Sequence, residues 1–196
     1  MQQSNSSSNI TKLIKTMSKL PDISQKTIKR ITFMLLKNKI LMRELIQALT
    51  ICEESVIECV KCRMYTENKE LCYICSSDTR NKRYLCIVSD MINLIAIERS
   101  QSFKGVYYVL HGMISHLNNI GPEELQLERL IDFIKQENIE EVLIGLSPNT
   151  QGQTTSYLLQ NLLQDIVNVR TLNIGVSLGA DLEYVDANTI AHAIPK

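Results

Sequence analysis

Residues 84–110 read YLCIVSDMINLIAIERSQSFKGVYYVL, in which two apolar runs enclose a stretch with helical spacing. The runs predict strands at residues 84–88 and 105–110, and the stretch between them predicts a helix at residues 91–98. The alternation continues with a helix at 123–137, a strand at 141–146, a helix at 154–163 and a strand near 169–174. Strands that alternate with helices are typical of a small α/β domain with a mainly parallel sheet.

The segment before this domain is helical and basic. Apolar residues recur at helical spacing between Ile10 and Leu49, with Pro21 interrupting them, which predicts two or three short helices. Nine basic and two acidic residues lie between Ile10 and Ile46, although the whole chain balances 21 Lys and Arg against 21 Asp and Glu. Residues 86–196 carry the opposite excess, with six basic and thirteen acidic side chains. Such a division suggests that one end of the chain meets a polyanion and the other does not.

Two CxxC pairs follow the helices, at Cys59-Val60-Lys61-Cys62 and Cys72-Tyr73-Ile74-Cys75. Two residues between cysteines let both thiolates reach one ion, and two such pairs complete the tetrahedral four-cysteine set of structural zinc. We therefore predict one structural Zn²⁺ per chain, held by Cys59, Cys62, Cys72 and Cys75. The alternatives are buried free thiols or a redox CxxC, which two matched pairs disfavour. Cys52 and Cys86 lie outside the pairs and are predicted to pack in the core.

The paired cysteines and residues 1–9 indicate the cellular compartment of the protein. No apolar run approaches the roughly 20 residues that cross a bilayer, so no membrane partner is expected. Residues 1–9 are polar, lack the pattern of a secretion signal and are expected to form a disordered tail. Paired cysteines without such a signal favour metal binding in a reducing compartment, so a cytoplasmic location is expected.

The order of parts resembles that of the RecR family of bacterial recombination mediators. A basic helical segment beginning around Leu20-Pro21 and the four-cysteine knuckle are followed by an α/β domain. This domain contains Asn119-Ile120-Gly121-Pro122-Glu123-Glu124-Leu125 and ends in Gly179-Ala180-Asp181-Leu182-Glu183-Tyr184-Val185-Asp186. The resemblance extends from about Ile10 to Ile194. It implies an α+β protein of several modules. These are a helix-hairpin-helix at 10–55, a four-cysteine zinc finger at 56–79, a Toprim-like α/β domain at 80–174 and a short C-terminal segment at 175–196.

The resemblance also implies a function. Members of the family form ring-shaped homo-oligomers that clamp single-stranded or double-stranded DNA, and for this chain a homotetramer is expected. They cooperate with RecO and RecF to load RecA onto single strands coated by the single-strand-binding protein. The expectation is therefore a mediator of DNA repair and homologous recombination after DNA damage, and not an enzyme.

The hairpin of the first module departs from the family pattern. It reads Leu20-Pro21-Asp22-Ile23-Ser24-Gln25-Lys26, in which both glycines of the family are replaced. Glycine lets backbone N–H groups approach a phosphate closely, whereas the carboxylate of Asp22 repels one. We therefore expect DNA binding to rest mainly on Lys26, Lys29 and Arg30. The alternative is that these side chains are only the solvated faces of oligomerising helices.

The Toprim resemblance is incomplete where catalytic members carry carboxylates for Mg²⁺. The first position corresponds to Ser89, with Asp90 beside it, and the later loop carries Gln151 and Gln153 where acidic residues are common in the family. Amide oxygens bring no charge to offset the dehydration of Mg²⁺, so the loop is predicted to be non-catalytic. The rival hypotheses are a Toprim-type nucleotidyl transferase or nuclease, and a zinc-stabilised scaffold that binds only protein.

Two further groups of polar residues are not assigned to catalysis. The resemblance likens one acidic group to a Walker B segment, but no phosphate-binding loop accompanies it, so a solvated surface or a contact with a partner or neighbouring subunit is predicted. This group consists of Asp181, Glu183 and Asp186. The histidines lack the spacing of a metal site or a nucleophile–base pair and are expected to be structural or surface side chains. They are His111, His116 and His192.

Overall fold

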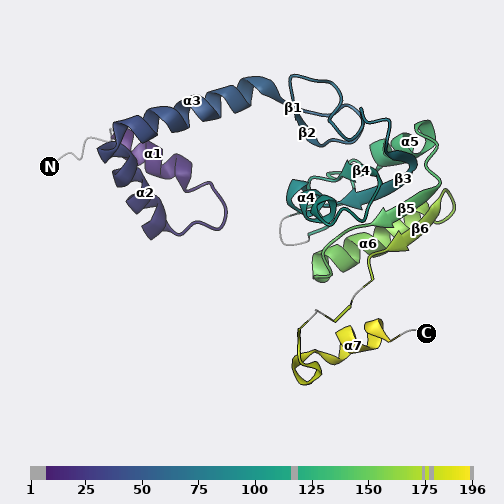
Figure 1. Ribbon diagram of the computed structural model, residues 1–196. Coiled ribbons are helices and arrows are strands. Elements are labelled where there is room, and N and C mark those ends of the chain that lie inside the picture. Colours follow the sequence, from purple (N-terminus) through teal and green to yellow (C-terminus); the bar gives the residue numbers. More distant parts are fainter. Residues whose placement is uncertain (1–7, 116–118, 174, 177–178, 195–196) are drawn as a thin grey trace. The chain divides into compact units, whose positions relative to one another are not determined.

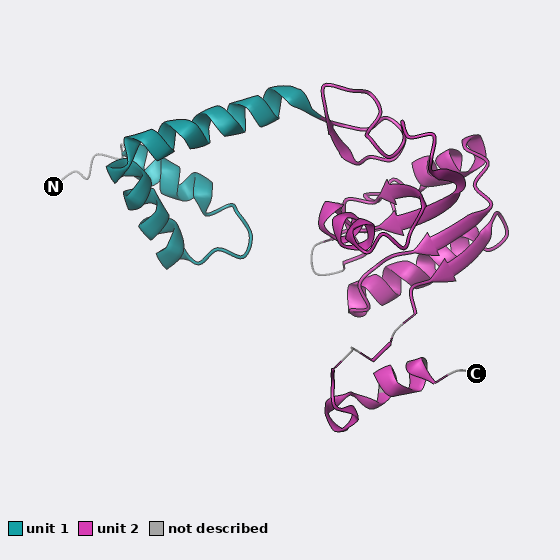
Figure 2. Cartoon of the chain, in the orientation of Figure 1, with its two compact units in different colours: residues 1–56 teal, residues 57–196 magenta. Residues whose placement is uncertain are grey.

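The computed structural model describes residues 8–115, 119–173, 175–176 and 179–194, except for the side chains of Asn188 and His192. The chain divides into two compact units, residues 1–56 and 57–196 (Figure 2). The finer module boundaries given above stay predictions. His116 and all but the last two residues of the expected tail lie outside the described residues, and Asn9, the last residue of that tail, already begins a helix.

The first unit contains three helices (Figure 1): α1 (Asn9–Met17), α2 (Gln25–Lys37) and α3 (Lys39–Ser55). Each is capped by a polar side chain that accepts a hydrogen bond from a backbone N–H of the first turn; the caps are Ser8, Ser24 and Asn38. Helices α1 and α2 pack on each other, and Thr32 Oγ1 lies 3.5 Å from Met17 Sδ. The buried side chains are Ile28, Thr32 and Leu35 of α2, so the enclosed core is small.

Helix α3 has no buried residue although it spans 17 residues. Leu41, Leu45 and Leu49 are 37%, 43% and 62% exposed. Together with Ala48 and Cys52 they lie along one side of the helix, and we call these five residues the α3 stripe. The exposure of Cys52 contradicts the prediction that it packs in the core, whereas Cys86 is buried as expected. The apolar pattern around Cys52 is present, but within the described part of a single chain it stays open to solvent.

The second unit is built on a parallel sheet of four strands in the order β4-β3-β5-β6. The strands are β3 (Asn81–Val88), β4 (Gly105–Val109), β5 (Glu141–Ile144) and β6 (Asn168–Thr171). In the central strand β3, Leu85 pairs with Val106 on one side and with Val142 on the other. Strands of such a sheet are covered on both faces, which explains the unbroken apolar runs of the sequence.

Helices connect these strands: α4 (Met91–Arg99), α5 (Leu127–Gln136) and α6 (Thr150–Leu163). Helix α4 packs against β3 and β4, and α6 packs against β6. Leu130 of α5 and Leu159 of α6 are fully buried. The predicted α/β domain with a parallel sheet is thus confirmed.

Two of these helices begin at other residues than the sequence predicted. The helix expected from residue 123 begins at Leu127, because turns precede it and Gln126 has a left-handed backbone with a φ of 51°. The helix expected from residue 154 begins at Thr150, because Asn149 caps it by accepting a hydrogen bond from the Gly152 N–H at 2.8 Å. A Cβ at Gly152 would lie 1.8 Å from the Ser147 carbonyl oxygen, so this turn requires glycine.

The remaining elements are short. Strands β1 (Val56–Glu58) and β2 (Tyr65–Glu67) form a two-stranded sheet next to the CxxC pairs. After β6 come a 3-10 helix, η2 (Leu182–Tyr184), and α7 (Ala187–Ala193). Within the described ranges, no helix is both long enough and apolar enough to cross a membrane.

Candidate functional site

The cysteines of the two CxxC pairs meet in one cluster, which we call the knuckle cluster. The Sγ atoms of Cys59, Cys62, Cys72 and Cys75 all lie within 4.8 Å of one another, and all four residues are buried. The backbone N–H of Cys72 donates to Cys59 Sγ, and that of Cys75 donates to Cys72 Sγ, each at 3.4 Å. Such donors stabilise the charge of a thiolate. The cluster therefore has the ligand set and the surroundings of a tetrahedral metal site.

Protons are shared unequally within the knuckle cluster. The hydrogen bond with the Cys62 thiol holds the pKa of Cys59 far below its usual range. The same bond with Cys59 raises the pKa of Cys62, and burial adds to the rise. A cation that binds all four sulfurs must therefore displace protons from part of the cluster. Metal affinity is expected to fall as the pH is lowered.

The residues that follow Cys62 fix the knuckle to the sheet. The Val109 N–H donates to the Cys62 carbonyl at 2.9 Å, and Nη1 of the buried Arg63 donates to the Leu110 carbonyl at 3.3 Å. His111 Nε2 lies 2.7 Å from the Arg63 carbonyl oxygen and donates to it. His111 is therefore a structural histidine with a satisfied ring nitrogen, as expected. These hydrogen bonds join the knuckle, where a metal would bind, directly to the end of β4.

Ser89 and Asp90 follow β3, at the position where the Toprim resemblance predicts a carboxylate in catalytic members. Asp90 caps α4 by accepting a hydrogen bond from the Asn93 N–H at 2.9 Å, and it also accepts from Ser89 Oγ at 2.9 Å. Both carboxylate oxygens of Asp90 therefore already accept hydrogen bonds from within the chain. Across the described ranges, only the four knuckle cysteines form a group of three or more His, Cys, Asp or Glu placed to hold one ion.

The two glutamines predicted to lie in a loop belong to the first turn of α6, because the helix begins at Thr150. Gln151 Nε2 donates to Ser115 Oγ at 3.1 Å, and Gln153 Nε2 donates to the Pro148 carbonyl at 3.2 Å. Both amides thus fasten the start of α6 to neighbouring segments. Neither residue presents a carboxylate.

The three cations predicted to bind DNA lie on one side of α2. Lys26, Lys29 and Arg30 are exposed in its first two turns, and their spacing of three and four residues places them on the same face. In the preceding loop, Asp22 has a φ of 59°, a conformation that suits glycine and that aspartate tolerates. In the hydrogen bonds of the described chain, the backbone N–H groups of residues 22–24 have no acceptor. The hairpin thus keeps free N–H groups although its glycines are replaced.

The acidic residues near the C-terminus differ in their surroundings. Asp181 precedes η2 and Glu183 lies within it, and both are exposed. Asp186 caps α7, where it accepts hydrogen bonds from the Thr189 N–H at 3.0 Å and from Thr189 Oγ1 at 2.6 Å. Asp186 therefore has a structural task in starting α7.

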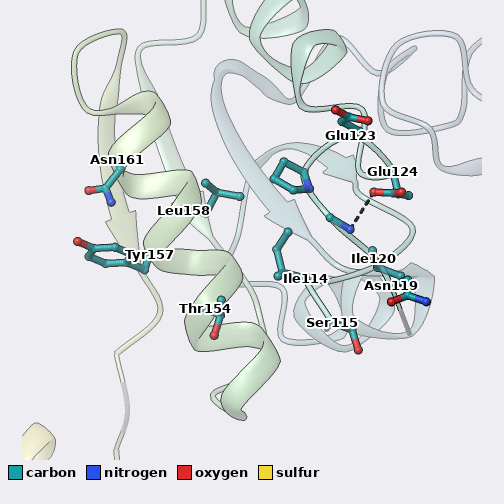
Figure 3. A pocket seen from close by; sticks show the side chains of 12 residues that line it. Ile114, Ser115, Asn119, Ile120, Glu123, Glu124, Thr154, Tyr157, Leu158 and Asn161 are labelled. Carbon is teal, nitrogen blue, oxygen red and sulfur yellow. Dashed lines mark hydrogen bonds between the residues drawn. The ribbon is translucent and has the colours of Figure 1, made fainter. Parts of the chain in front are cut away.

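Part of the stretch that resembles RecR, residues 119–124, borders a pocket of about 750 Å³, and α6 borders it from the other side (Figure 3). The Gly121 N–H donates to the Glu124 carboxylate at 2.8 Å, which closes the turn. Ile120 and Leu158 contribute apolar lining, while Glu123 and Glu124 contribute carboxylates. An apolar pocket with acidic residues at one end suits a protein partner that carries apolar and basic side chains.

The sequence gives no sign of one partly buried polar group. Arg80 and Glu98 form an ion pair, and Arg80 Nη1 also donates to the carbonyls of Phe103 and Gly105. The Tyr107 hydroxyl donates to Glu98 at 2.9 Å. The Arg80 guanidinium beside it holds the pKa of Glu98 below its usual range. These partners lie far apart in the sequence, so no local pattern signals the group.

Comparison with known proteins agrees with this architecture. The family model of the Toprim domain matches residues 83–173, and the model described as RecR, C-terminal matches residues 175–194. The chain is thus a Toprim-domain protein with a cysteine knuckle and basic N-terminal helices. "Recombination protein RecR" of Prochlorococcus marinus (strain AS9601) is 36% identical over 186 residues, which cover 94% of this chain and 93% of the relative. That of Staphylococcus haemolyticus (strain JCSC1435) is 38% identical over 189 residues, which cover 94% of each. The chain belongs to the RecR family of recombination proteins, which confirms the resemblance seen in the sequence.

Proposed function

We propose that this chain is a non-enzymatic mediator of DNA repair and homologous recombination. It acts in the cytoplasm as a homo-oligomeric clamp on DNA, expected as a homotetrameric ring. With RecO and RecF it loads RecA onto single strands coated by the single-strand-binding protein. The observation that carries the proposal is the cationic face of α2 beside a hairpin with free backbone N–H groups, in a chain of the RecR family.

The DNA contact combines two kinds of donor. Lys26, Lys29 and Arg30 supply three positive charges on one helix face, and phosphates are the partners that such a face attracts. Backbone N–H groups of residues 22–24 and the start of α2 add weaker donors for a phosphate oxygen. Neither kind reads base sequence, so the contact is expected to follow the DNA backbone.

The knuckle cluster is proposed to hold one structural Zn²⁺ through Cys59, Cys62, Cys72 and Cys75. Four thiolates complete a tetrahedral shell and leave no open position for water, so the ion stabilises the fold and does not catalyse. The hydrogen bond between the Cys62 carbonyl and the Val109 N–H links this stabilisation to the sheet.

Association with other copies and with partner proteins uses other surfaces. The α3 stripe offers apolar area that a second copy covers in the oligomer. Asp181, Glu183 and Asp186, together with the acidic end of the pocket beside α6, offer negative charge to RecO, RecF or a neighbouring subunit.

The test is the salt dependence of DNA binding, measured by fluorescence anisotropy with a labelled single strand. The double substitution Lys26→Ala/Arg30→Ala removes two charges per chain and is expected to weaken binding and to flatten the slope of log K against log salt by about 1.4 for each chain in contact. The matched control is Lys37→Ala/Lys39→Ala, which removes the same charge near the other end of α2 and is expected to change the slope less.

Equal slopes for the two double variants would place the DNA contact elsewhere on the chain. Absence of binding at low salt for the unmodified chain would instead favour the scaffold that binds only protein. Mg²⁺-dependent nicking or ligation by the pure protein, lost in Asp90→Ala, would favour the Toprim-type enzyme.

A further inference from the structure

We propose that a second nucleic-acid subsite lies in the pocket between the cysteine knuckle and α4, where it takes one base of single-stranded DNA and the phosphates next to it. The inference rests on the proposed function, because that function brings the chain to a single strand. The subsite belongs to the second unit and does not involve the cations of α2.

The pocket has a volume of about 510 Å³ and is lined from three elements. Tyr73 comes from the knuckle, Ile95 and Arg99 come from α4, and Gln101, Phe103 and Lys104 come from the connection between α4 and β4. The volume suits one base with its sugar and phosphate. The lining combines two aromatic side chains, an isoleucine, an amide, two cations and the carboxylate of Glu98.

Tyr73 has the properties of a stacking platform. Its side chain is 59% exposed, whereas its neighbours Cys72 and Ile74 are each 1% exposed. The ring therefore stands in solvent while its backbone is held between buried residues of the knuckle. A tyrosine has only two side-chain torsions to order when a base stacks on it, and stacking tolerates any base.

The base of the pocket is rigid. Phe103 is 7% exposed, and its ring packs against those of Tyr84 and Tyr107 with centroid distances of 4.8 and 5.1 Å. Arg80 Nη1 donates to the Phe103 carbonyl at 3.3 Å, which fixes the backbone beneath the pocket. The site is therefore formed before any ligand arrives.

The charges of the pocket favour a polyanion. Glu98 is the acidic residue of the lining, and its carboxylate is offset by the ion pair with Arg80. Arg99 and Lys104 are exposed, and within the described ranges neither forms an ion pair. Arg99 and Lys104 thus offer two positive charges to phosphates, although the charge of Lys104 also acts on the Glu98 carboxylate, in the half of the chain that is acidic as a whole.

The exposed ring and the two cations together favour single-stranded over double-stranded DNA. In a duplex the faces of the bases are covered by their neighbours, so a ring in a pocket cannot stack on them. In a single strand one base can lie on Tyr73 while the adjoining phosphates contact Arg99 and Lys104. The exposed Gln101 can donate to or accept from the edge of that base.

The test compares two probes of equal length in the full chain: labelled oligo(dT), and an abasic strand with the same number of phosphates. Tyr73→Ala is expected to weaken binding of oligo(dT) about 5-fold to 100-fold and to leave binding of the abasic strand unchanged. Tyr73→Phe keeps the ring and is expected to restore the affinity for oligo(dT). Arg99→Gln/Lys104→Gln is expected to weaken the binding of both probes and to flatten the salt dependence of both affinities.

The matched control is Tyr65→Ala, which removes a 49% exposed tyrosine from the same knuckle but from outside the pocket. It is expected to bind both probes like the unmodified chain. The zinc content of each variant, measured in the same samples, shows whether the knuckle has kept its fold.

The outcomes separate this inference from the proposed function. One outcome is that Lys26→Ala/Arg30→Ala weakens DNA binding while Tyr73→Ala changes the affinities for the two probes equally or not at all. In that case the pocket does not bind a base and the proposed function stands. If the unmodified chain binds neither probe, both fail. If free dTMP displaces oligo(dT) at the same nucleotide concentration as unlabelled oligo(dT), the pocket is a mononucleotide site and the inference of a strand subsite is wrong.

Discussion

The two units of the chain differ in how they bury apolar surface. Among residues 8–56 of the first unit, the buried side chains all belong to α2, and neither α1 nor α3 contributes one. In the second unit a continuous core extends from the knuckle cysteines through β3 and β4 to α6. Burial is the main stabilising contribution to a fold, so the second unit is expected to be stable by itself. The first unit is expected to need association with other copies.

The same division separates the charges. The first unit carries its excess of cations on helices with little core, whereas the second carries an acidic surface around a rigid sheet. We infer that the first unit supplies DNA-binding and oligomerising surfaces, and that the second supplies the stable scaffold. Substitutions in the two units should therefore have different effects.

Loss of the metal should affect the second unit most. Cys72→Ser removes one ligand of the knuckle cluster and is expected to abolish zinc binding and to lower the free energy of unfolding by several kcal/mol, since structural zinc contributes on the order of 10 kcal/mol in isolated fingers. Metal analysis and thermal unfolding measure the two effects. Cys52→Ser, at an exposed cysteine, is the control and should keep its zinc. A Cys72→Ser variant that stays fully folded would mean that the knuckle is not a metal-dependent element.

The α3 stripe should decide the oligomeric state. Leu45→Glu places a charge in the stripe and is expected to weaken association by about 10-fold to 100-fold, because burying one leucine contributes roughly 1.5–3 kcal/mol. Light scattering after size exclusion measures the mass. Ile92→Glu, at a 79% exposed isoleucine of α4, is the control and should leave the mass unchanged. An unaltered mass for Leu45→Glu would show that copies meet elsewhere.

The ion pair of Arg80 and Glu98 should contribute to the stability of the second unit in a pH-dependent way. The pKa of Glu98 lies below its ordinary 4.5, so its contribution is present above that pH and is lost as the pH falls through the lowered value. Glu98→Gln is expected to lower the free energy of unfolding at neutral pH by about 1–3 kcal/mol and to remove this acid dependence. Denaturant unfolding at pH 7 and at about pH 4 measures the loss of unfolding free energy and its dependence on pH.

The control for this prediction is Glu140→Gln. Glu140 also pairs with an arginine, Arg83, but both side chains are about two thirds exposed, so a change below about 0.5 kcal/mol is expected. Equal losses in the two variants would contradict the structural role assigned to the partly buried pair of Arg80 and Glu98.

The smallest effect is expected at the hairpin of the first unit. Asp22→Gly suits the left-handed backbone and removes a negative charge from the proposed DNA contact, so DNA affinity is expected to rise about 2-fold to 5-fold while stability changes by less than about 1 kcal/mol. Asp22→Asn removes the charge and also tolerates this backbone. A gain in Asp22→Gly that is absent in Asp22→Asn would assign the effect to backbone approach and not to charge.

The sheet and the knuckle cluster could be predicted because their causes are local. The central strand β3 is buried on both faces, so an unbroken apolar run from Leu85 to Val88 marks it. The spacing within each CxxC pair fixes which thiols can share an ion. The stretches that resemble RecR predict the family, which the similarity to its members confirms.

The other features of the fold and of the site depend on contacts and backbone conformations that a local sequence pattern does not show. The late start of α5 follows from the backbone of Gln126, and nothing in the residue types around it predicts a left-handed conformation there. The bond between His111 and Arg63 joins residues 48 positions apart. Cys52 is predicted to pack in the core because it lies outside the CxxC pairs, but the sequence does not say whether the same chain or another copy covers it.

Whether the chain is an oligomeric DNA clamp is decided by its solution mass and its DNA binding, determined on one sample of the full chain. We expect an oligomer that binds DNA at low salt and loses affinity steeply as salt increases. A monomer that does not bind DNA at low salt would contradict this expectation.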